Sequence, residues 1–300
     1  MKGSKKITFT GIGAPKSGSS WVSDSLYEHP QVQMPGREPK KELDFFCSRK
    51  KDIFQQLNHS TYGEGFNWYL KQFPAQQQYK GKNKIIGEFS VSYLSDAKSP
   101  ELIKKHLPDV KLIAVLRNPT DMIFSLHNYI LTAVKPKVPK NFAQAIKKGH
   151  YIKDAKYGEQ LINFYKYFKK QQIHIIFFED IINKPEKVLK NLFNFLHIDN
   201  TFKPSFFGKK VNPAVETRSE GVKKLTGKVI KTLENLKLKP VLNFLQTNET
   251  VFKLYRKINT KPAQKKQIPP KLRKKLISYF KEDISLLENL TGRDLSNWKR

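Results

Sequence analysis

A strand, a glycine-containing loop and a helix follow one another at the start of the chain, and this order restricts the possible folds most. Residues 7–13 (ITFTGIG) have the β-branched composition of a strand and end in glycine. Residues 19–29 (SSWVSDSLYEH) predict a helix that Ser19 or Ser20 would cap and that Pro30 would end. Such a unit presents backbone N–H groups and the positive end of a helix to an anion. The layout at the start of the chain is therefore compatible with an anion site directly after the first strand.

The loop within residues 11–21 (GIGAPKSGSSW) resembles a phosphate-binding loop whose lysine is displaced. A nucleotide-hydrolysing P-loop reads G-x-x-x-x-G-K-[ST]. Gly13 and Gly18 have its glycine spacing, but Ser19 occupies the position of the lysine, and the lysine of this loop is Lys16. The displacement argues against an ATPase or a kinase. Three interpretations remain open for the loop alone: a defective nucleotide site, a chance turn, or a site for a different phosphate.

Strand and helix patterns alternate along the chain as far as residue 198. Strands are predicted at 110–119 and 173–180, a strand that leads into a loop at 84–94, and helices at 66–73, 100–108, 120–131, 157–168 and 185–198. The apolar run at 110–119 (VKLIAVLRNP) is typical of a parallel strand that is buried on both faces. The alternation favours an α/β class with a central parallel sheet flanked by helices, that is, a P-loop-like three-layer fold. The last eighty or so residues contain helical patterns only, notably 269–290. We therefore expect a single domain over residues 1–300, with a core of about 5–215 and a helical C-terminal extension of about 220–300.

Charge and cysteine content limit the classes of function. The chain carries 56 Lys+Arg against 26 Asp+Glu, a formal net charge of +30. Such an excess favours a polyanionic partner, such as a nucleic acid, an acidic polysaccharide or an anionic membrane surface, but genome composition explains an abundance of lysine equally well. The single cysteine, Cys47, excludes an intrachain disulfide. No apolar run has the length of a signal-peptide core or the roughly 18 residues of a membrane span, so we expect a cytoplasmic protein.

Arg117 and Ser125, which follow the buried strand, indicate a second phosphate site. Arg117 ends the strand near the carboxyl edge of the sheet, where open α/β sheets bind ligands. Ser125 lies eight residues further on, about two helical turns. An arginine fork and a hydroxyl in this position could hold a phosphate. An arginine in an ordinary surface ion pair is an equally good interpretation of Arg117 alone.

Other side chains have both a functional and a structural interpretation. Glu42 adjoins Phe45 and Phe46, and burial among aromatic rings would raise its pKa and suit a general base, although a solvated loop acid is the simpler reading. His106, in KKHLP, is expected at the surface and is not selected as a base. Trp21 could stack on a nucleobase or belong to the core.

Taken together, these motifs resemble the sulfotransferases that use 3′-phosphoadenosine 5′-phosphosulfate (PAPS). PKSGSSW (15–21) looks like the 5′-phosphosulfate loop of that family, and RNPTDMIFS (117–125) looks like its 3′-phosphate motif. EHPQV (28–32) and KELDFF (41–46) resemble elements of its carbohydrate branch, which includes the heparan sulfate type. Further similar segments, including one common in bacterial members, extend the resemblance over nearly the whole chain: 85–94, 173–198 and 268–298.

The resemblance implies a role for each matching residue. Arg117 and Ser125 would hold the 3′-phosphate, Trp21 would stack on adenine, and Glu42 would act as the base. The 5′-phosphosulfate would be held by Lys16, Ser17, Gly18, Ser19 and Ser20. No metal is required, because Lys16 and backbone amides can satisfy the single leaving phosphate.

Three positions depart from the pattern of the family. The small-molecule branch uses a histidine in K-T-H-L-P, but His106 is only eleven residues before Arg117, about half the gap in that branch, so we treat the match as accidental. Phe89 stands where some glycosaminoglycan enzymes have a lysine. The Arg-Lys-Gly segment of the small-molecule branch has only a loose counterpart in RSEGVKK (218–224).

The sequence therefore predicts a PAPS-dependent sulfotransferase that acts on an acceptor hydroxyl by in-line displacement. Lys16 would neutralise the leaving 5′-phosphate oxygen, and Glu42 would take the proton of the acceptor. The favoured acceptor is a carbohydrate, either an acidic glycan or a glycolipid, and no nucleic-acid partner is expected. Two alternatives stay open: a P-loop nucleotide kinase or phosphotransferase, and a non-enzymatic protein that binds polyanions or nucleic acid.

Overall fold

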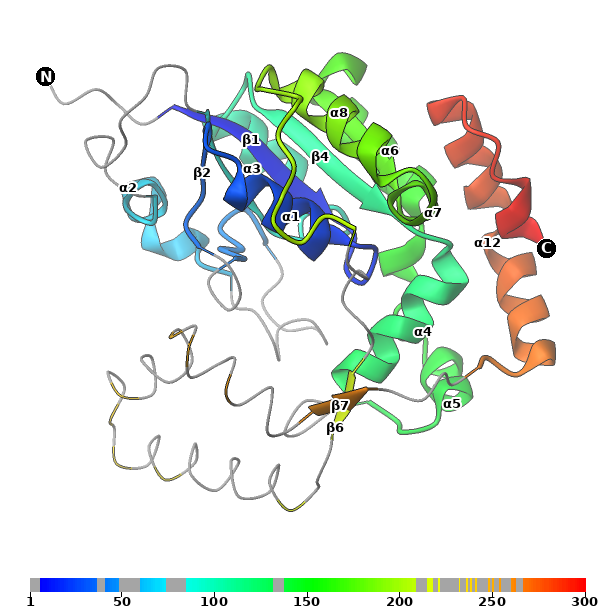
Figure 1. The fold of residues 1–300 in the computed structure, drawn as a ribbon. Coiled ribbons are helices and arrows are strands. Elements are labelled where there is room, and N and C mark those ends of the chain that lie inside the picture. Colours follow the sequence, from blue (N-terminus) through cyan, green and yellow to red (C-terminus); the bar gives the residue numbers. More distant parts are fainter. Residues whose placement is uncertain are drawn as a thin grey trace, which may run out of the picture.

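A five-stranded parallel sheet lies at the centre of the described part of the chain (Figure 1). The computed structural model describes residues 6–36, 41–48, 60–73, 85–131, 138–208 and 267–300, the strands 215–217 and 260–262, and a few isolated positions between them. The strand order is β2-β3-β1-β4-β5, and all neighbours are parallel. The strands are β1 (Ile7–Gly13), β2 (Val32–Gln33), β3 (Ile85–Phe89), β4 (Lys111–Leu116) and β5 (Ile173–Phe177). This sheet confirms the predicted α/β class.

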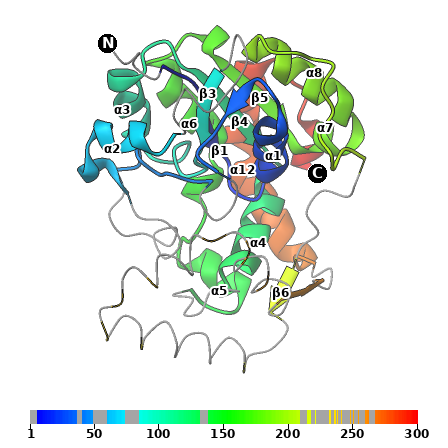
Figure 2. The same ribbon diagram turned by 60° about the vertical axis from the view of Figure 1, so that its left-hand side comes forward.

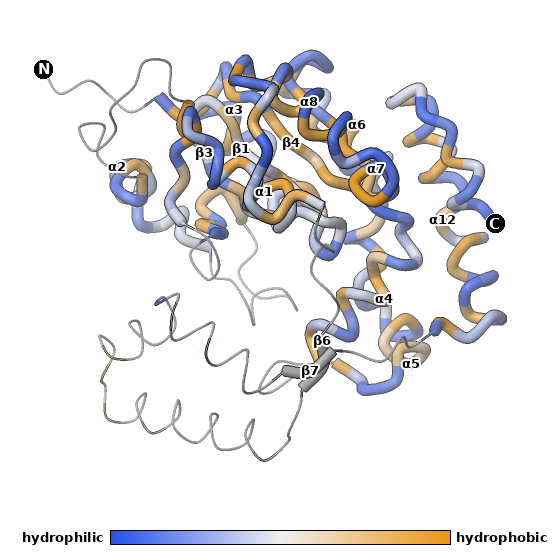
Figure 3. The backbone as a smooth tube through the Cα atoms, viewed as in Figure 1, coloured by the Kyte–Doolittle hydropathy of each residue, from blue (hydrophilic) through white to orange (hydrophobic). Residues whose placement is uncertain are grey.

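Helices pack on both faces of the sheet and complete three layers (Figures 1 and 2). Successive side chains of a strand point to opposite faces, so β4 contributes to two separate cores. Leu112, Ala114 and Leu116 face the first core, Ile113 and Val115 face the second, and all five are 0% exposed. Figure 3 shows the apolar residues concentrated along β1 and β4 and mixed with polar ones along the flanking helices.

The helices divide between the two cores. The first core includes side chains of α2 (Phe66–Lys71), α3 (Ser99–His106), α4 (Pro119–Ile130), α5 (Phe142–Lys147), α6 (Tyr157–Tyr165) and α12 (Pro270–Thr291). The second core includes side chains of α1 (Ser19–Glu28), α7 (Phe178–Asn183) and α8 (Pro185–Leu196). Short 3₁₀ helices lie at Tyr62–Glu64, Lys153–Ala155, Lys170–Gln172 and Ser296–Lys299.

The C-terminal helix α12 is built into the first core. Its buried face contributes four apolar side chains that are at most 2% exposed: Leu276, Phe280, Ile284 and Leu287. Their spacing of three and four residues is that of an amphipathic helix. The carboxylate of Asp283 accepts hydrogen bonds from the backbone N–H groups of Gly158 (3.0 Å) and Glu159 (2.9 Å). α12 therefore caps the start of α6 from a position more than 120 residues away.

Three details of the predicted elements are wrong. Neither Ser19 nor Ser20 caps α1, because Ser19 is its first residue and Gly18 is the N-cap, with a φ of 94° and no capping side chain. The strand predicted at 173–180 ends at Phe177, where α7 begins. The last eighty residues also contain a strand, β7 (Thr260–Pro262), which pairs in antiparallel orientation with β6 (Val215–Thr217).

The neighbouring strands β1 and β4 mark the point where the chain connections diverge. After β1 the chain enters α1, which packs in the second core, whereas after β4 it enters α4, which packs in the first core. Open α/β sheets bind ligands in the crevice at the carboxyl ends of two such strands. The loop after β1 and Arg117 after β4 both lie at this edge.

Candidate active site

The loop after β1 is closely packed against β4 and α7. The N–H of Ala14 donates to the carbonyl oxygen of Val115 at 2.7 Å. Lys16 and Gly18 adopt positive φ angles of 55° and 94°. A Cβ at Gly18 would lie 3.0 Å from side-chain carbons of both Phe178 and Ile181, so only glycine combines this φ with this close approach. The turn leads directly into α1, whose first N–H groups are the usual anion donors of a helix.

Arg117 contacts this loop from the neighbouring strand. Its Nη1 donates a hydrogen bond to the carbonyl oxygen of Lys16 at 3.1 Å, across 101 residues of sequence. Its guanidinium carbon lies 4.6 Å from the centroid of the Phe178 ring. The bond to Lys16 uses one of the five N–H donors that a guanidinium carries. The structure therefore brings together the two basic residues that the sequence analysis selected.

Helix α4 places Ser125 on the face that meets the loop. Ser125 and Tyr129 are four residues apart in one helix and therefore share a face. The ammonium of Lys16 lies 4.2 Å from the centroid of the Tyr129 ring. Ser125 thus lies one helical turn from the aromatic side chain that contacts Lys16. The sequence analysis missed Tyr129, although its helical spacing from Ser125 could have indicated it.

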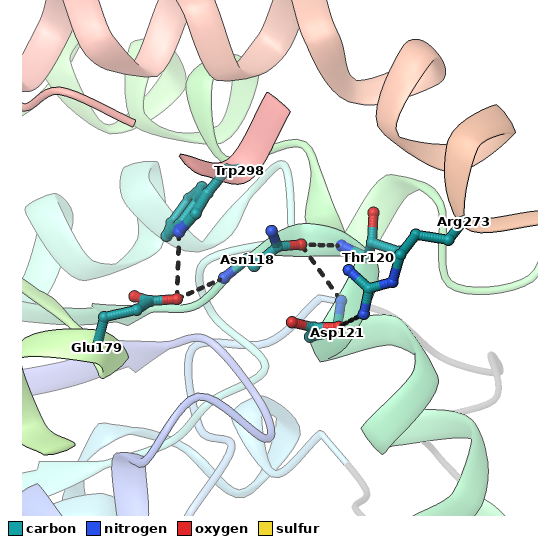
Figure 4. A network of polar contacts seen from close by, with 6 residues as sticks. All are labelled: Asn118, Thr120, Asp121, Glu179, Arg273 and Trp298. Carbon is teal, nitrogen blue, oxygen red and sulfur yellow. Dashed lines mark hydrogen bonds and ion pairs between the residues drawn. The ribbon is translucent and has the colours of Figure 1, made fainter. Parts of the chain in front are cut away.

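A network of polar contacts fixes the backbone that follows Arg117 (Figure 4). Glu179, in the first turn of α7, accepts hydrogen bonds from the N–H of Asn118 (3.4 Å) and from Nε1 of Trp298 (3.1 Å). The side chain of Asn118 caps α4 by accepting hydrogen bonds from two N–H groups of its first turn. Arg273 of α12 pairs with Asp121 in the same turn. Hydrogen bonds of Glu179 therefore connect α7, which packs in the second core, to Asn118 and Trp298 on the side of the first core. This connection lies at the candidate 3′-phosphate motif.

Glu42 lies beside the loop, next to a buried lysine. Its side chain is 22% exposed, and Oε1 is 3.5 Å from the ammonium of Lys41. That ammonium also donates a hydrogen bond to Oγ of Ser19 at 3.4 Å. Lys41 therefore connects the predicted base to the first residue of α1. The sequence analysis assigned no role to Lys41, because its burial depends on residues distant in sequence.

Two further carboxyl groups are buried next to Glu42. Burial, together with the charge of Glu42, raises the pKa of Asp44 to about 7. Burial raises the pKa of Glu88 to about 8. The hydroxyl of Ser90 connects the two, since it donates to Oε2 of Glu88 (2.7 Å) and accepts from the N–H of Asp44 (3.0 Å). The raised pKa of Glu88 favours its neutral form at pH 7.

The remaining residues of interest occupy largely apolar surroundings. Trp21, for which stacking on a nucleobase or a place in the core was expected, is 4% exposed and belongs to the second core. His106, expected at the surface, is half-buried: its ring stacks on Phe66 with 4.6 Å between centroids, and Nε2 is 3.1 Å from the hydroxyl of Tyr62. Burial lowers the pKa of His106. β4 separates His106 from Arg117, so they lie at opposite ends of a strand about 20 Å long at 3.3 Å per residue.

The segment 218–224, which has a loose likeness to the Arg-Lys-Gly element, lies outside the described residues except for Gly221. Among the helices that the structure describes, none combines the length and the apolar character needed to cross a membrane.

Comparison with known proteins identifies relatives across most of the chain. The human heparan sulfate glucosamine 3-O-sulfotransferase 5 is 25% identical over 198 residues, which cover 62% of this chain and 52% of that protein. The membrane-associated sulfotransferase kil1 of Dictyostelium discoideum is 24% identical over 290 residues, with 65% and 58% covered. The chain thus spans about half the length of these curated relatives.

A solved structure and a family profile also match this chain. The crystal structure of a sulfotransferase from Alicyclobacillus acidocaldarius superimposes with a TM-score of 0.65 at 21% identity, and it covers 98% of this chain and 99% of that one. This likeness shows a common fold. The profile of the sulfotransferase domain family matches residues 11–289. The chain therefore belongs to the sulfotransferase domain family, whose members use PAPS as the donor of a sulfuryl group.

Proposed function

We propose that this chain transfers a sulfuryl group from PAPS to a hydroxyl group of a carbohydrate. One observation carries the proposal: Nη1 of Arg117, after β4, donates a hydrogen bond at 3.1 Å to the backbone carbonyl oxygen of Lys16 in the glycine loop, although 101 residues separate them. Two basic groups at the carboxyl edge of neighbouring strands suit a ligand with two separate phosphate groups.

The groups at the site fit a doubly phosphorylated nucleotide. An ammonium, a guanidinium, the serine hydroxyls and the N–H groups at the start of α1 are all hydrogen-bond donors, and two of them are cationic. In this proposal Lys16 and residues 17–20 hold the 5′-phosphosulfate, while Arg117 and Ser125 hold the 3′-phosphate. Trp21, as a core residue, would offer only its exposed edge to the adenine.

The chemistry assigned to these residues is positioning and charge stabilisation. PAPS supplies the activated sulfuryl group when it is bound. Lys16 stabilises the negative charge that develops on the 5′-phosphate oxygen as the bond to sulfur breaks. Glu42 removes the proton from the acceptor hydroxyl, a contribution of about 10²- to 10⁴-fold in rate. Arg117 and Ser125 keep the nucleotide in register with the acceptor.

Two observations support an acidic glycan as the acceptor. The net charge of +30 would attract a polyanionic substrate and raise its association rate. The human relative is named for heparan sulfate, a sulfated and therefore acidic glycan. A glycolipid is the competing acceptor, and sulfation assays with the two classes of substrate distinguish them.

Calorimetric titration with adenosine 3′,5′-bisphosphate (PAP), ADP and ATP tests the cofactor site. We expect PAP to bind at least tenfold more tightly than ADP, because each charge-assisted bond to the 3′-phosphate contributes more than a neutral one. Arg117→Ala should remove this preference, and Lys16→Ala should weaken the binding of PAP and ADP alike. Equal affinity of the unaltered protein for PAP and ADP would contradict the proposal.

Transfer assays with labelled PAPS test the role of Glu42. The Glu42→Gln variant should bind PAP normally and lose about 10²- to 10⁴-fold in kcat. A variant with unchanged kcat would show that another group takes the proton.

A further inference from the structure

Lys41 is buried beside the candidate phosphosulfate loop. It is 2% exposed, and in the part of the chain that the structure describes no other lysine is buried to this extent. A buried ammonium is unfavourable unless nearby groups compensate for the lost hydration. The groups around Lys41 should therefore show what compensates its buried charge.

The described contacts of Lys41 compensate its charge only in part. The hydrogen bond to Oγ of Ser19 is 3.4 Å long, and the ion pair with Glu42 is 3.5 Å long. Charge-assisted bonds of an ammonium are normally about 2.7 to 2.9 Å, and an ammonium has three N–H donors. Both contacts are therefore long, and the ammonium retains capacity for a further anionic oxygen.

Packing directs the ammonium of Lys41 toward the loop. It lies 5.3 Å from the centroid of the Phe89 ring. That ring lies directly on Gly11 of the neighbouring strand, where a Cβ would fall 2.2 Å from the ring carbons. Phe89 is thus fixed between β1 and Lys41, and it holds the ammonium at the start of α1.

The two lysines approach the loop from opposite sides of β1. The ammonium of Lys16 lies against Tyr129 of α4, the helix that follows β4. The ammonium of Lys41 lies over Phe89, the last residue of β3. β3 and β4 flank β1 in the sheet. An anion bound at the loop after β1 would therefore have one lysine on each side.

We propose that Lys41 is a second cation of the sulfuryl-transfer centre, whose ammonium contacts an oxygen of the transferring sulfuryl group; this rests on the proposed function. In the step, the acceptor oxygen bonds to sulfur while the bond from sulfur to the 5′-phosphate oxygen breaks. The electron pair of that bond stays on the 5′-phosphate, and the acceptor proton passes to Glu42. Lys41 stabilises the sulfuryl oxygens, Lys16 stabilises the leaving oxygen, and the Lys41 contact keeps Glu42 at the site.

The Lys41→Met variant tests this assignment, because methionine keeps the apolar stem and removes the charge. PAP lacks the sulfuryl group, so its affinity should stay within about threefold of that of the unaltered protein. Affinity for PAPS in the absence of acceptor should fall about tenfold, the effect of one lost hydrogen bond to a charged group. The kcat should fall about 10²- to 10³-fold, as for the loss of one oxyanion donor. Lys41→Arg should recover part of the kcat.

Lys111→Met is the matched control. Lys111, at the start of β4, is also partly buried, donates to the carbonyl of Phe195, and lies 5.3 Å from the Phe195 ring, but at the other end of the strand from the site. Its substitution should leave kcat and both affinities unchanged. If Lys41→Met keeps kcat and the affinity ratio of PAPS to PAP, Lys41 is structural and the inference is wrong. If Lys41→Met fails to fold, the same affinity ratio is measured with Lys41→Gln.

The cofactor titration separates this inference from the proposed function. A protein without preference for PAP over ADP contradicts the proposed function itself. A protein with that preference and with transfer activity, but without an effect of Lys41→Met, contradicts only the role of Lys41.

Discussion

The Glu88→Gln variant is expected to gain stability relative to the unaltered protein as the pH rises, because Glu88 is a buried acid beside the site. Glu88 is 0% exposed, and Oε1 has no hydrogen-bond partner among the described residues. Its Oε2 accepts a hydrogen bond from Ser90, which the amide oxygen of a glutamine side chain can also accept. The side-chain NH2 group of glutamine would take the buried position of Oε1, so at pH 5 the variant should be less stable than the unaltered protein by about 1 to 3 kcal/mol.

The magnitude follows from the pKa of Glu88 in the two states. Burial raises it from 4.5 to about 8 in the folded protein. Between these values the folded state keeps a proton that the unfolded state has lost, so the free energy of unfolding falls as the pH rises. The slope is at most about 1.36 kcal/mol per pH unit. Between pH 5 and pH 8 the protein should thus lose about 3 kcal/mol of stability through this one group.

Urea unfolding at pH 5, 6, 7 and 8 measures this difference. The free energy of unfolding of Glu88→Gln, relative to that of the unaltered protein, should rise by about 3 kcal/mol across the range, whereas Glu101→Gln, at an exposed position on α3, should follow the unaltered protein. The buried Asp44 titrates in all three proteins and cancels from the comparison to first order. Parallel curves for Glu88→Gln and the unaltered protein would refute the assignment of a neutral Glu88.

Three other substitutions test the support of the site. Asn118→Ala removes the cap of α4 and should cost about 0.5 to 2 kcal/mol in urea unfolding; no loss would mean that solvent replaces the cap. Gly18→Ala meets both an unfavourable φ and the 3.0 Å contacts with α7, so it should cost about 1 to 3 kcal/mol and weaken PAP binding in calorimetry. Arg273→Met breaks the pair with Asp121, whose side chains are 38% and 34% exposed, and should cost less than about 1 kcal/mol, with a smaller effect in 1 M salt. A loss that salt does not reduce would show that packing of the arginine stem, and not its charge, matters.

The elements that carry a local signal could be predicted from the sequence. The run at 110–119 is apolar as far as Leu116, apart from Lys111, and it forms β4, which begins one residue after and ends three residues before the predicted bounds. The proximity of Lys16 and Arg117 follows from the topology, because carboxyl ends of parallel strands share one edge. The α/β class and the site at that edge are therefore consequences of hydrophobic pattern and glycine placement.

Features that depend on distant contacts could not be predicted. Lys41 stands in a polar run, and its burial results from Phe89 and Ser19, which lie on other elements. The raised pKa belongs to Asp44 and Glu88, because tertiary packing and not the adjacent Phe45-Phe46 pair determines which carboxyl is dehydrated. His106 follows two lysines in sequence, but rings from residues 62 and 66 surround it.

The burial of β4 on both faces has a practical consequence for measuring ligand affinity. Residues 112–116 are 0% exposed between the two cores, so their amide hydrogens should exchange with solvent only when the whole domain unfolds. A ligand that binds the folded state slows such exchange wherever it binds, because it raises the free energy of unfolding. The increase is about 2.7 kcal/mol at a ligand concentration of 100 Kd. Deuterium uptake along β4 would therefore report the affinity for PAP or PAPS while the acceptor is still unidentified.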